Sequence, residues 1–72
     1  MNNAKVERAL QSAGLPFSYE NDGVRVHLED NASLPPHTAR TLVEAGLEFN
    51  SVMQDRSGTH VDFKKRGMGG FL

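Results

Sequence analysis

The chain has 72 residues, a formal net charge of −1, 24% charged residues and no cysteine. A chain of this length forms one small domain that buries only about 60% of its unfolded surface, so its core is marginal. The lack of cysteine excludes disulfide bonds and thiolate metal sites, and the near-neutral charge does not by itself indicate nucleic-acid binding. The sequence has no leader pattern and no apolar run of about 18 residues. We therefore expect a cytoplasmic protein without membrane contact.

The first half of the chain predicts a helix followed by a β-hairpin. Apolar residues recur at helical spacing before Gly14, and Asn2 or Asn3 is suited to cap the start of this helix. Residues 15–20 and 24–28 alternate between apolar and polar, as strands with one buried face do. The turn signal Asn21-Asp22-Gly23 separates them. The positions expected to face the core are Val6, Ala9, Leu10, Ala13, Leu15, Phe17, Tyr19, Val24, Val26 and Leu28.

The second half predicts the same order of elements. Pro35 and Pro36 suit the first turn of a helix, Ser33 is the expected N-cap, and Gly46 is expected to end the helix. A third strand then starts at Leu47. Residues 55–58 form the next turn, and a fourth strand follows it. The positions expected to face the core are Ala39, Leu42, Val43, Leu47, Phe49, Ser51, Met53, Val61 and Phe63.

A repeated phrase links the two halves, because residues 10–17 read LQSAGLPF and residues 42–49 read LVEAGLEF. We therefore predict an α+β fold built as an αββ-αββ pseudo-two-fold repeat, with a four-stranded, mainly antiparallel sheet and two helices packed on one face. Residues 1–63 form the domain, in halves 1–30 and 31–63, and residues 64–72 form a flexible tail. An alternative is that all helix-glycine-strand junctions converge on similar residues. Either interpretation predicts the same architecture.

Alternation along the strands also defines the outer face of the sheet. Its expected members are Ser18, Glu20, Arg25, His27, Asn50, Val52, His60 and Asp62. His27 and His60 lie on the second strands of the two halves, so a two-fold would bring them together. With Asp62 they could bind a divalent metal or perform acid–base chemistry, although the spacing matches no metal motif. The alternative is a solvated polar face.

The tail, KKRGMGGFL, combines the cations Lys64, Lys65 and Arg66 with glycines and the apolar end Phe71-Leu72. Such a segment could become ordered in the groove of a protein partner or on phosphates, or it could serve only as a solubilising terminus. It resembles the basic, glycine-rich and aromatic ending of the small head-to-tail joining proteins of lambda-like phages. That resemblance covers nine residues and implies a structural connector, but those proteins have one hairpin between two helices.

These features favour a non-enzymatic module that binds another protein or itself, as a homodimer, through exposed sheet edges and the tail. The alternative is a nucleic-acid-binding module that uses Arg25, His27, His60 and the basic tail. The expected inward orientation of the phenylalanines disfavours that alternative, because sheets that bind nucleic acid usually display aromatic residues. A small metal-dependent enzyme built on His27, His60 and Asp62 is a third hypothesis. No cofactor is predicted.

Overall fold

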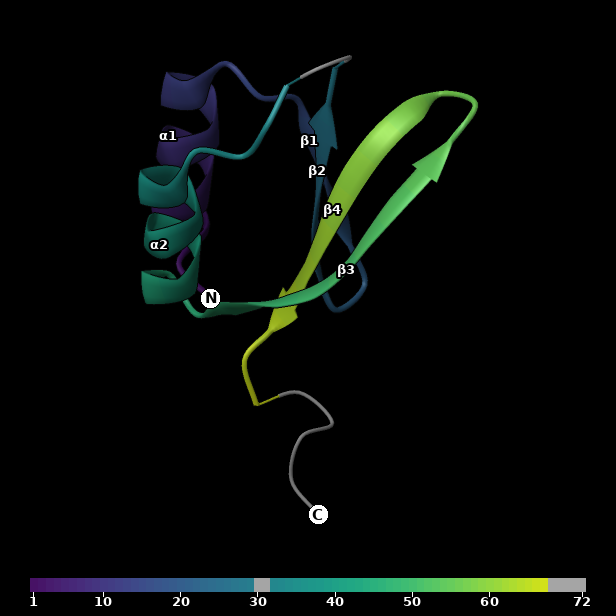
Figure 1. Cartoon of the computed structure of the whole chain (residues 1–72). Coiled ribbons are helices and arrows are strands. Elements are labelled where there is room, and N and C mark those ends of the chain that lie inside the picture. Colours follow the sequence, from purple (N-terminus) through teal and green to yellow (C-terminus); the bar gives the residue numbers. More distant parts are fainter. Residues whose placement is uncertain (30–31, 68–72) are drawn as a thin grey trace.

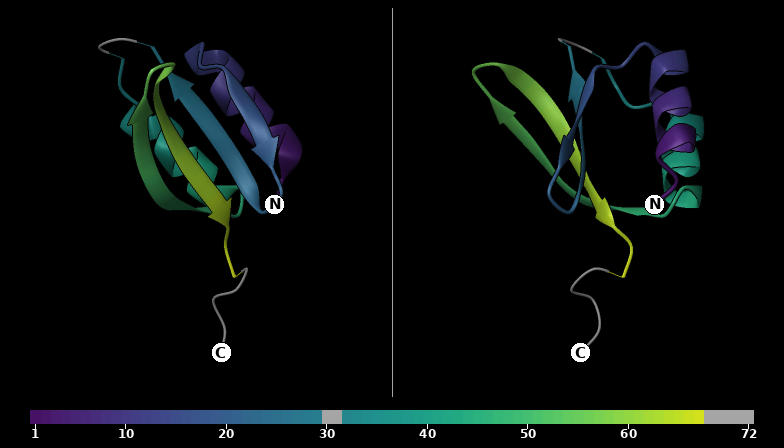
Figure 2. Two further views of the ribbon diagram at one scale, coloured as in Figure 1. Left: turned by 90° about the vertical axis from the view of Figure 1, so that its right-hand side faces the viewer. Right: turned by 180° about the vertical axis from the view of Figure 1, so that it is seen from behind.

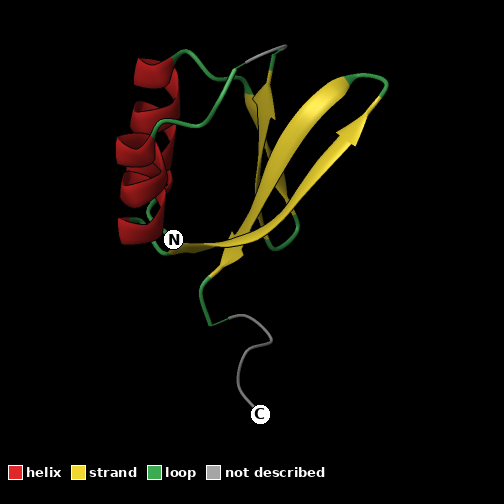
Figure 3. Ribbon diagram, in the orientation of Figure 1, coloured by secondary structure: helices red, strands yellow, loops and turns green. Residues whose placement is uncertain are grey.

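The computed structural model describes residues 1–29 and 32–67 and shows an α+β fold with two helices and one sheet (Figures 1 and 3). The elements follow the predicted order. They are α1 (Asn3–Ala13), β1 (Phe17–Glu20), β2 (Gly23–Leu28), α2 (Pro36–Glu44), β3 (Leu47–Asp55) and β4 (Gly58–Lys65).

The four strands form one antiparallel sheet in the order β1-β2-β4-β3, with both helices on the same face (Figure 2). The second strands of the two hairpins, β2 and β4, lie at the centre. The first strands, β1 and β3, are the edges. The number of strands, their antiparallel pairing and the position of both helices on one face agree with the sequence prediction.

The ends of the helices follow local sequence signals with one exception. The side chain of Asn2 accepts a hydrogen bond from the backbone of Lys5, which caps α1, and Gly14 ends α1 in the left-handed region at φ 71°. Gly46 follows α2 at φ 105°. The prediction of Ser33 as the second N-cap is wrong, because Pro35 occupies that position without a side-chain hydrogen bond.

The core lies between the helices and the two central strands. Val24, Val26, Val61 and Phe63 cover the inner face of β2 and β4, and the helices add their own apolar residues. Pairing of Val26 with Val61 and of Val24 with Phe63 brings these side chains together across the centre of the sheet. The buried apolar residues are Val6, Leu10, Val24, Val26, Leu28, Leu42, Ala45, Leu47, Val61 and Phe63.

Gly23 permits the close pairing of the central strands. A Cβ atom at this buried position would lie 1.8 Å from the carbonyl oxygen of Phe63, a distance that no packed structure tolerates. Any side chain there would push β2 away from β4. The turn signal that contains Gly23 therefore also secures the centre of the sheet.

A β-bulge in β3 overturns part of the predicted strand orientation. Phe49 pairs with Phe63, but the register shifts before Ser51, which pairs with Asp62. Because one extra residue reverses the alternation of side chains, Val52 lies on the inner face, opposite Val61, and Met53 lies on the outer face, opposite His60. The predictions that Ser51 and Met53 face inward and that Val52 faces outward are therefore wrong.

Besides Met53, three residues expected in the core are substantially exposed. Phe49 is on the inner face and its ring contacts that of Phe63, yet it is 57% exposed because the β3–β4 hairpin diverges from the helices (Figure 1). Val43 of α2 is also exposed. Tyr19 packs its ring against Phe17 but exposes nearly half of its surface, and its hydroxyl donates a 2.5 Å hydrogen bond to Glu7 of α1.

The last strand extends two residues beyond the predicted end of the domain at position 63, since β4 includes Lys64 and Lys65. Of the predicted tail, residues 68–72 lie outside the described residues. Neither of the two helices described is long and apolar enough to cross a membrane.

The contacting pair Phe49 and Phe63 provides a matched test of this packing. Phe63→Ala should lower the free energy of unfolding by about 3–5 kcal/mol, because it opens a cavity in the core. Phe49→Ala should cost only about 1 kcal/mol, because the exposed ring loses little more than its edge-to-face contact. Urea denaturation of both variants measures the difference. Equal destabilisation would contradict the exposed position of Phe49.

Candidate functional site

The outer face of the sheet brings together four of the eight residues predicted there. Arg25 pairs with Asp62 and His27 pairs with His60 across the central strands β2 and β4. The two imidazole rings have centroids 6.2 Å apart. The sequence prediction that His27 and His60 are neighbours is therefore confirmed.

Arg25 and Asp62 form a bidentate ion pair. The guanidinium Nε donates to one carboxylate oxygen at 2.9 Å, and a terminal nitrogen donates to the other at 3.1 Å. The Asp62 side chain is only 19% exposed. Its hydrogen bonds with Arg25 lower the pKa of the Asp62 carboxyl and outweigh the opposing effect of burial.

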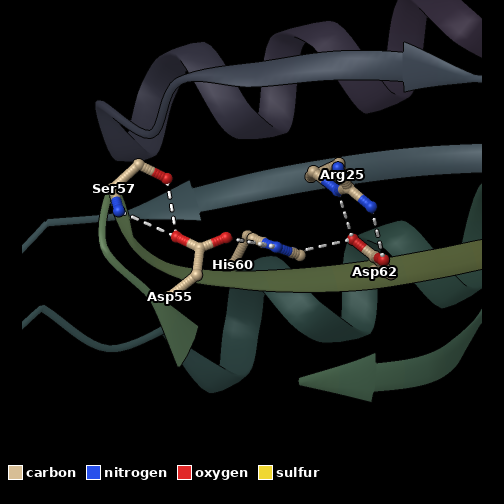
Figure 4. A network of polar contacts seen from close by, with 5 residues as sticks. All are labelled: Arg25, Asp55, Ser57, His60 and Asp62. Atoms are coloured by element: carbon tan, nitrogen blue, oxygen red, sulfur yellow. Dashed lines mark hydrogen bonds and ion pairs between the residues drawn. The ribbon is translucent and has the colours of Figure 1, made fainter. Parts of the chain in front are cut away.

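His60 lies at the middle of this face and is only 7% exposed, which differs from the solvated histidine considered from sequence. Its neighbours on the adjacent strands are His27 and Met53, so side chains flank it on both sides. Its Nδ1 lies 3.2 Å from Asp62, and its Nε2 lies 3.8 Å from Asp55 (Figure 4). Because an ionised carboxylate only accepts hydrogen bonds, the Nδ1 atom carries a hydrogen.

The hairpin turn completes the network. Asp55 accepts hydrogen bonds from the backbone amide of Ser57 at 2.9 Å and from its hydroxyl at 2.7 Å (Figure 4). These bonds lower the pKa of the Asp55 carboxyl. The sequence predicts residues 55–58 only as a turn and does not indicate their link to His60. The Asp-x-Ser spacing, which allows an aspartate side chain to bond the amide two residues ahead, is the signal that could have revealed it.

The network connects three strands through side-chain hydrogen bonds and ion pairs. The hydroxyl of Ser57 donates to Asp55. Within residues 1–29 and 32–67, no three histidine, aspartate or glutamate side chains are arranged to hold a metal ion. The network instead joins β2, β4 and the tip of the β3–β4 hairpin.

The remaining predicted site residues lie apart from this network. Lys64 pairs in register with Gly23 and Glu48, and Lys65 pairs with Leu47. The guanidinium of Arg66 donates to the carbonyl oxygen of Val43 at the end of α2. Phe71 and Leu72 lie outside the described residues. The structure thus unites Arg25, His27, His60 and Asp62, but it does not bring the three basic residues to them.

A second feature, missed by the sequence analysis, is the apolar edge formed by Phe49, Val52 and Met53 on β3. Each of these side chains is more than half exposed. They display apolar surface on both faces of a nine-residue strand that, among the described strands, pairs only with β4. We call this feature the β3 edge. Asn50 and Ser51, two consecutive polar residues between the apolar Phe49 and Val52, were the available signal for the bulge that creates it.

Comparisons of the chain with protein families, curated protein sequences and solved structures found no significant match.

Asp62→Asn should reduce stability near pH 6 by about 1–2 kcal/mol, because it removes the charged partner of a partly exposed Arg25. The folded pKa of Asp62 lies below its value of about 4 in the unfolded chain. The Asp62 carboxylate therefore contributes fully to the free energy of unfolding at pH values above its unfolded pKa. This contribution disappears as the pH falls through the folded pKa. The stability gap between parent and variant should narrow on acidification, as measured by urea denaturation.

Asp22→Asn is the control for this experiment, because the Asp22 side chain is exposed and makes no hydrogen bond or ion pair with any residue in the described ranges. Its stability should follow that of the parent at every pH. A gap between the parent and Asp62→Asn that stays constant from neutral to acidic pH would show that the charge of Asp62 does not stabilise the fold.

Proposed function

We propose that the protein is a non-enzymatic binding module that associates with a second copy of itself through the β3 edge. The observation that carries this proposal is the exposure of Phe49, Val52 and Met53 beside unpaired backbone groups of an edge strand. Exposed edge strands attract further strands, and exposed apolar groups favour association because their burial removes them from water.

The other edge of the sheet is less suited to this role. Strand β1 has only four residues, directly follows Pro16, and is tied to α1 by the hydrogen bond between Tyr19 and Glu7. Short edges and proline are the means by which proteins discourage pairing between sheets. Strand β3 has nine residues and no proline. Its bulge interrupts the edge near Asn50, which leaves residues 51–55 as the regular stretch for pairing.

This stretch is compatible with itself in a two-fold antiparallel arrangement. If the axis passes at Met53, Asp55 faces Ser51 of the other copy. Each Asp55 then lies opposite an uncharged side chain, which avoids the destabilising juxtaposition of like charges. The result is one sheet that continues through both copies.

We also propose that the two halves of the chain are related by an approximate two-fold. In its support, each half consists of a helix, a positive-φ glycine and a hairpin, and β2 and β4 pair at the centre with Val26 opposite Val61. Such symmetry places the first strand of each half at an edge of the sheet, so the bulge in β3 and the shortness of β1 are what distinguish the two edges.

We also propose a cytoplasmic location, which fits the absence of cysteine from the sequence.

The parent protein should self-associate at micromolar concentration. Val52→Lys should shift it to monomer, because the association would place two lysines close together. Val43→Lys is the matched control, since Val43 is also an exposed valine but lies on α2. Sedimentation velocity distinguishes the species. A monomeric parent, or equal effects of the two substitutions, would contradict association through the β3 edge.

Removal of residues 68–72 tests the role predicted for the tail. If association uses the β3 edge, this deletion should leave the sedimentation pattern unchanged. Loss of association on deletion, with none for Val52→Lys, would assign self-association to the tail.

Nucleic-acid binding gives a different signature. The basic residues Lys64, Lys65 and Arg66 follow one another at the end of β4, whereas Arg56 lies in the turn at its other end. Three adjacent cations limit the slope of log affinity against log salt to about −3 on duplex DNA. We expect only weak binding, which replacement of Lys64 and Lys65 by alanine should remove. Tight binding with a steeper slope would favour the nucleic-acid alternative.

A further inference from the structure

The two ring nitrogens of the buried His60 each face a carboxylate, but at different distances. Nδ1 lies 3.2 Å from an oxygen of Asp62, within the range of a hydrogen bond. Nε2 lies 3.8 Å from an oxygen of Asp55, beyond that range. The ring is therefore bonded to a residue of its own strand, β4, while its contact with the end of β3 is open.

The open contact follows from the hydrogen-bonding capacity of a neutral imidazole ring. Such a ring carries one hydrogen, which in His60 lies on Nδ1 because Asp62 accepts it. Nε2 then presents a lone pair to the carboxylate of Asp55, and neither group can donate. A second hydrogen on Nε2 converts this contact between two acceptors into a charge-assisted hydrogen bond, which is shorter and stronger than a neutral one.

The charges around His60 leave room for one more cation. Arg25 neutralises Asp62, whereas Asp55 has no lysine or arginine within ion-pair distance among the residues described. The hydrogen bonds from the Ser57 hydroxyl and amide hold the pKa of the Asp55 carboxyl below its ordinary value, so it is ionised near neutral pH. The titratable and charged groups that face His60 or its carboxylate partners are His27 and Arg25 of β2, Asp55 of β3 and Asp62 of β4.

We propose that His60 and Asp55 form a pH-sensitive latch at the tip of the β3–β4 hairpin. Histidine is the side chain that ordinarily gains a proton as the pH falls from about 8 to 5. With a neutral ring the latch is open. With a protonated ring, Nε2 donates to Asp55 and draws the end of β3 toward β4. A charge at this buried position is compensated, because a carboxylate lies at each ring nitrogen.

Closure of the latch regulates the β3 edge, and this step rests on the proposed association of two copies. Asp55 is the last residue of the stretch 51–55 that is regular enough to pair with a second copy, and it is the only charged residue of that stretch. Protonated His60 neutralises this charge and holds the end of the strand in place. Because both effects lower the cost of pairing, association should strengthen in mild acid.

Amide NMR of the Val52→Lys variant tests the latch in the absence of association. The amide of Ser57, which donates to Asp55, should shift between about pH 8 and pH 5 with the same midpoint as the ring protons of His60. In this background His60→Gln should abolish the shift. Asp55→Asn should also abolish it, although His60 still titrates. His27→Gln is the matched control, because it removes the exposed neighbouring imidazole, and it should preserve the shift.

A Ser57 amide that does not follow the His60 ring, or that follows it equally in Asp55→Asn, would overturn the latch. Far-UV circular dichroism verifies the fold of each variant. Should the buried position not accept glutamine, Asp55→Asn decides the result, since Asp55 is about half exposed.

Sedimentation velocity of the parent at about pH 7.5 and pH 5.5 tests the regulatory step. The dissociation constant of the dimer should fall about threefold in acid, as expected for one partly exposed ion pair. His60→Gln should lose this gain and His27→Gln should retain it. Equal gains in the two variants would assign the effect to net charge and overturn regulation by the latch. A parent that is monomeric at both pH values would contradict association itself, while the Ser57 shift still decides whether the latch exists.

Discussion

The length of the helices limits what this fold can bury. An α-helix rises about 1.5 Å per residue, so the nine residues of α2 cover about 14 Å. The nine residues of β3 extend over about 30 Å, because a strand rises about 3.3 Å per residue. A hairpin that is twice as long as its covering helix must project beyond it. The buried core therefore concentrates on β2 and β4. Leu47 at the start of β3 is buried, whereas Phe49, Val52 and Met53 remain exposed.

Neither α1 nor α2 covers the outer face of the sheet (Figure 2). There the polar network replaces apolar packing. Arg25 and Asp62 link the central strands, and Asp55 links His60 to the hairpin turn. Bonds of this type need defined geometry, so they hold the projecting hairpin in a defined position against β2. The exposed apolar side chains of β3 are thereby presented on a fixed strand.

Much of this architecture is predictable from sequence, because its signals are local. The helix cap at Asn2, the turn before Gly23 and the alternation of β2 each depend on a few adjacent residues. The turn and the alternation were placed correctly, and the cap is one of the two asparagines predicted for it. The bulge near Asn50 was not predictable from alternation, because it depends on pairing between strands. For the same reason, the sequence indicated that His60 lies beside His27, but it did not indicate that residues from other strands bury His60.

The contact between Tyr19 and Glu7 gives the molecule an intrinsic optical reporter. Tyr19 is the only tyrosine and the chain has no tryptophan, so near-ultraviolet absorption and emission are dominated by this single phenol. Its hydrogen bond to Glu7 raises the pKa of Tyr19 to about 12, compared with about 10 for a free phenol. In alkali near pH 11, ionisation of the phenol therefore reports loss of the hydrogen bond between Tyr19 and Glu7. Absorbance of the native chain can follow the opening of this one junction without any attached label.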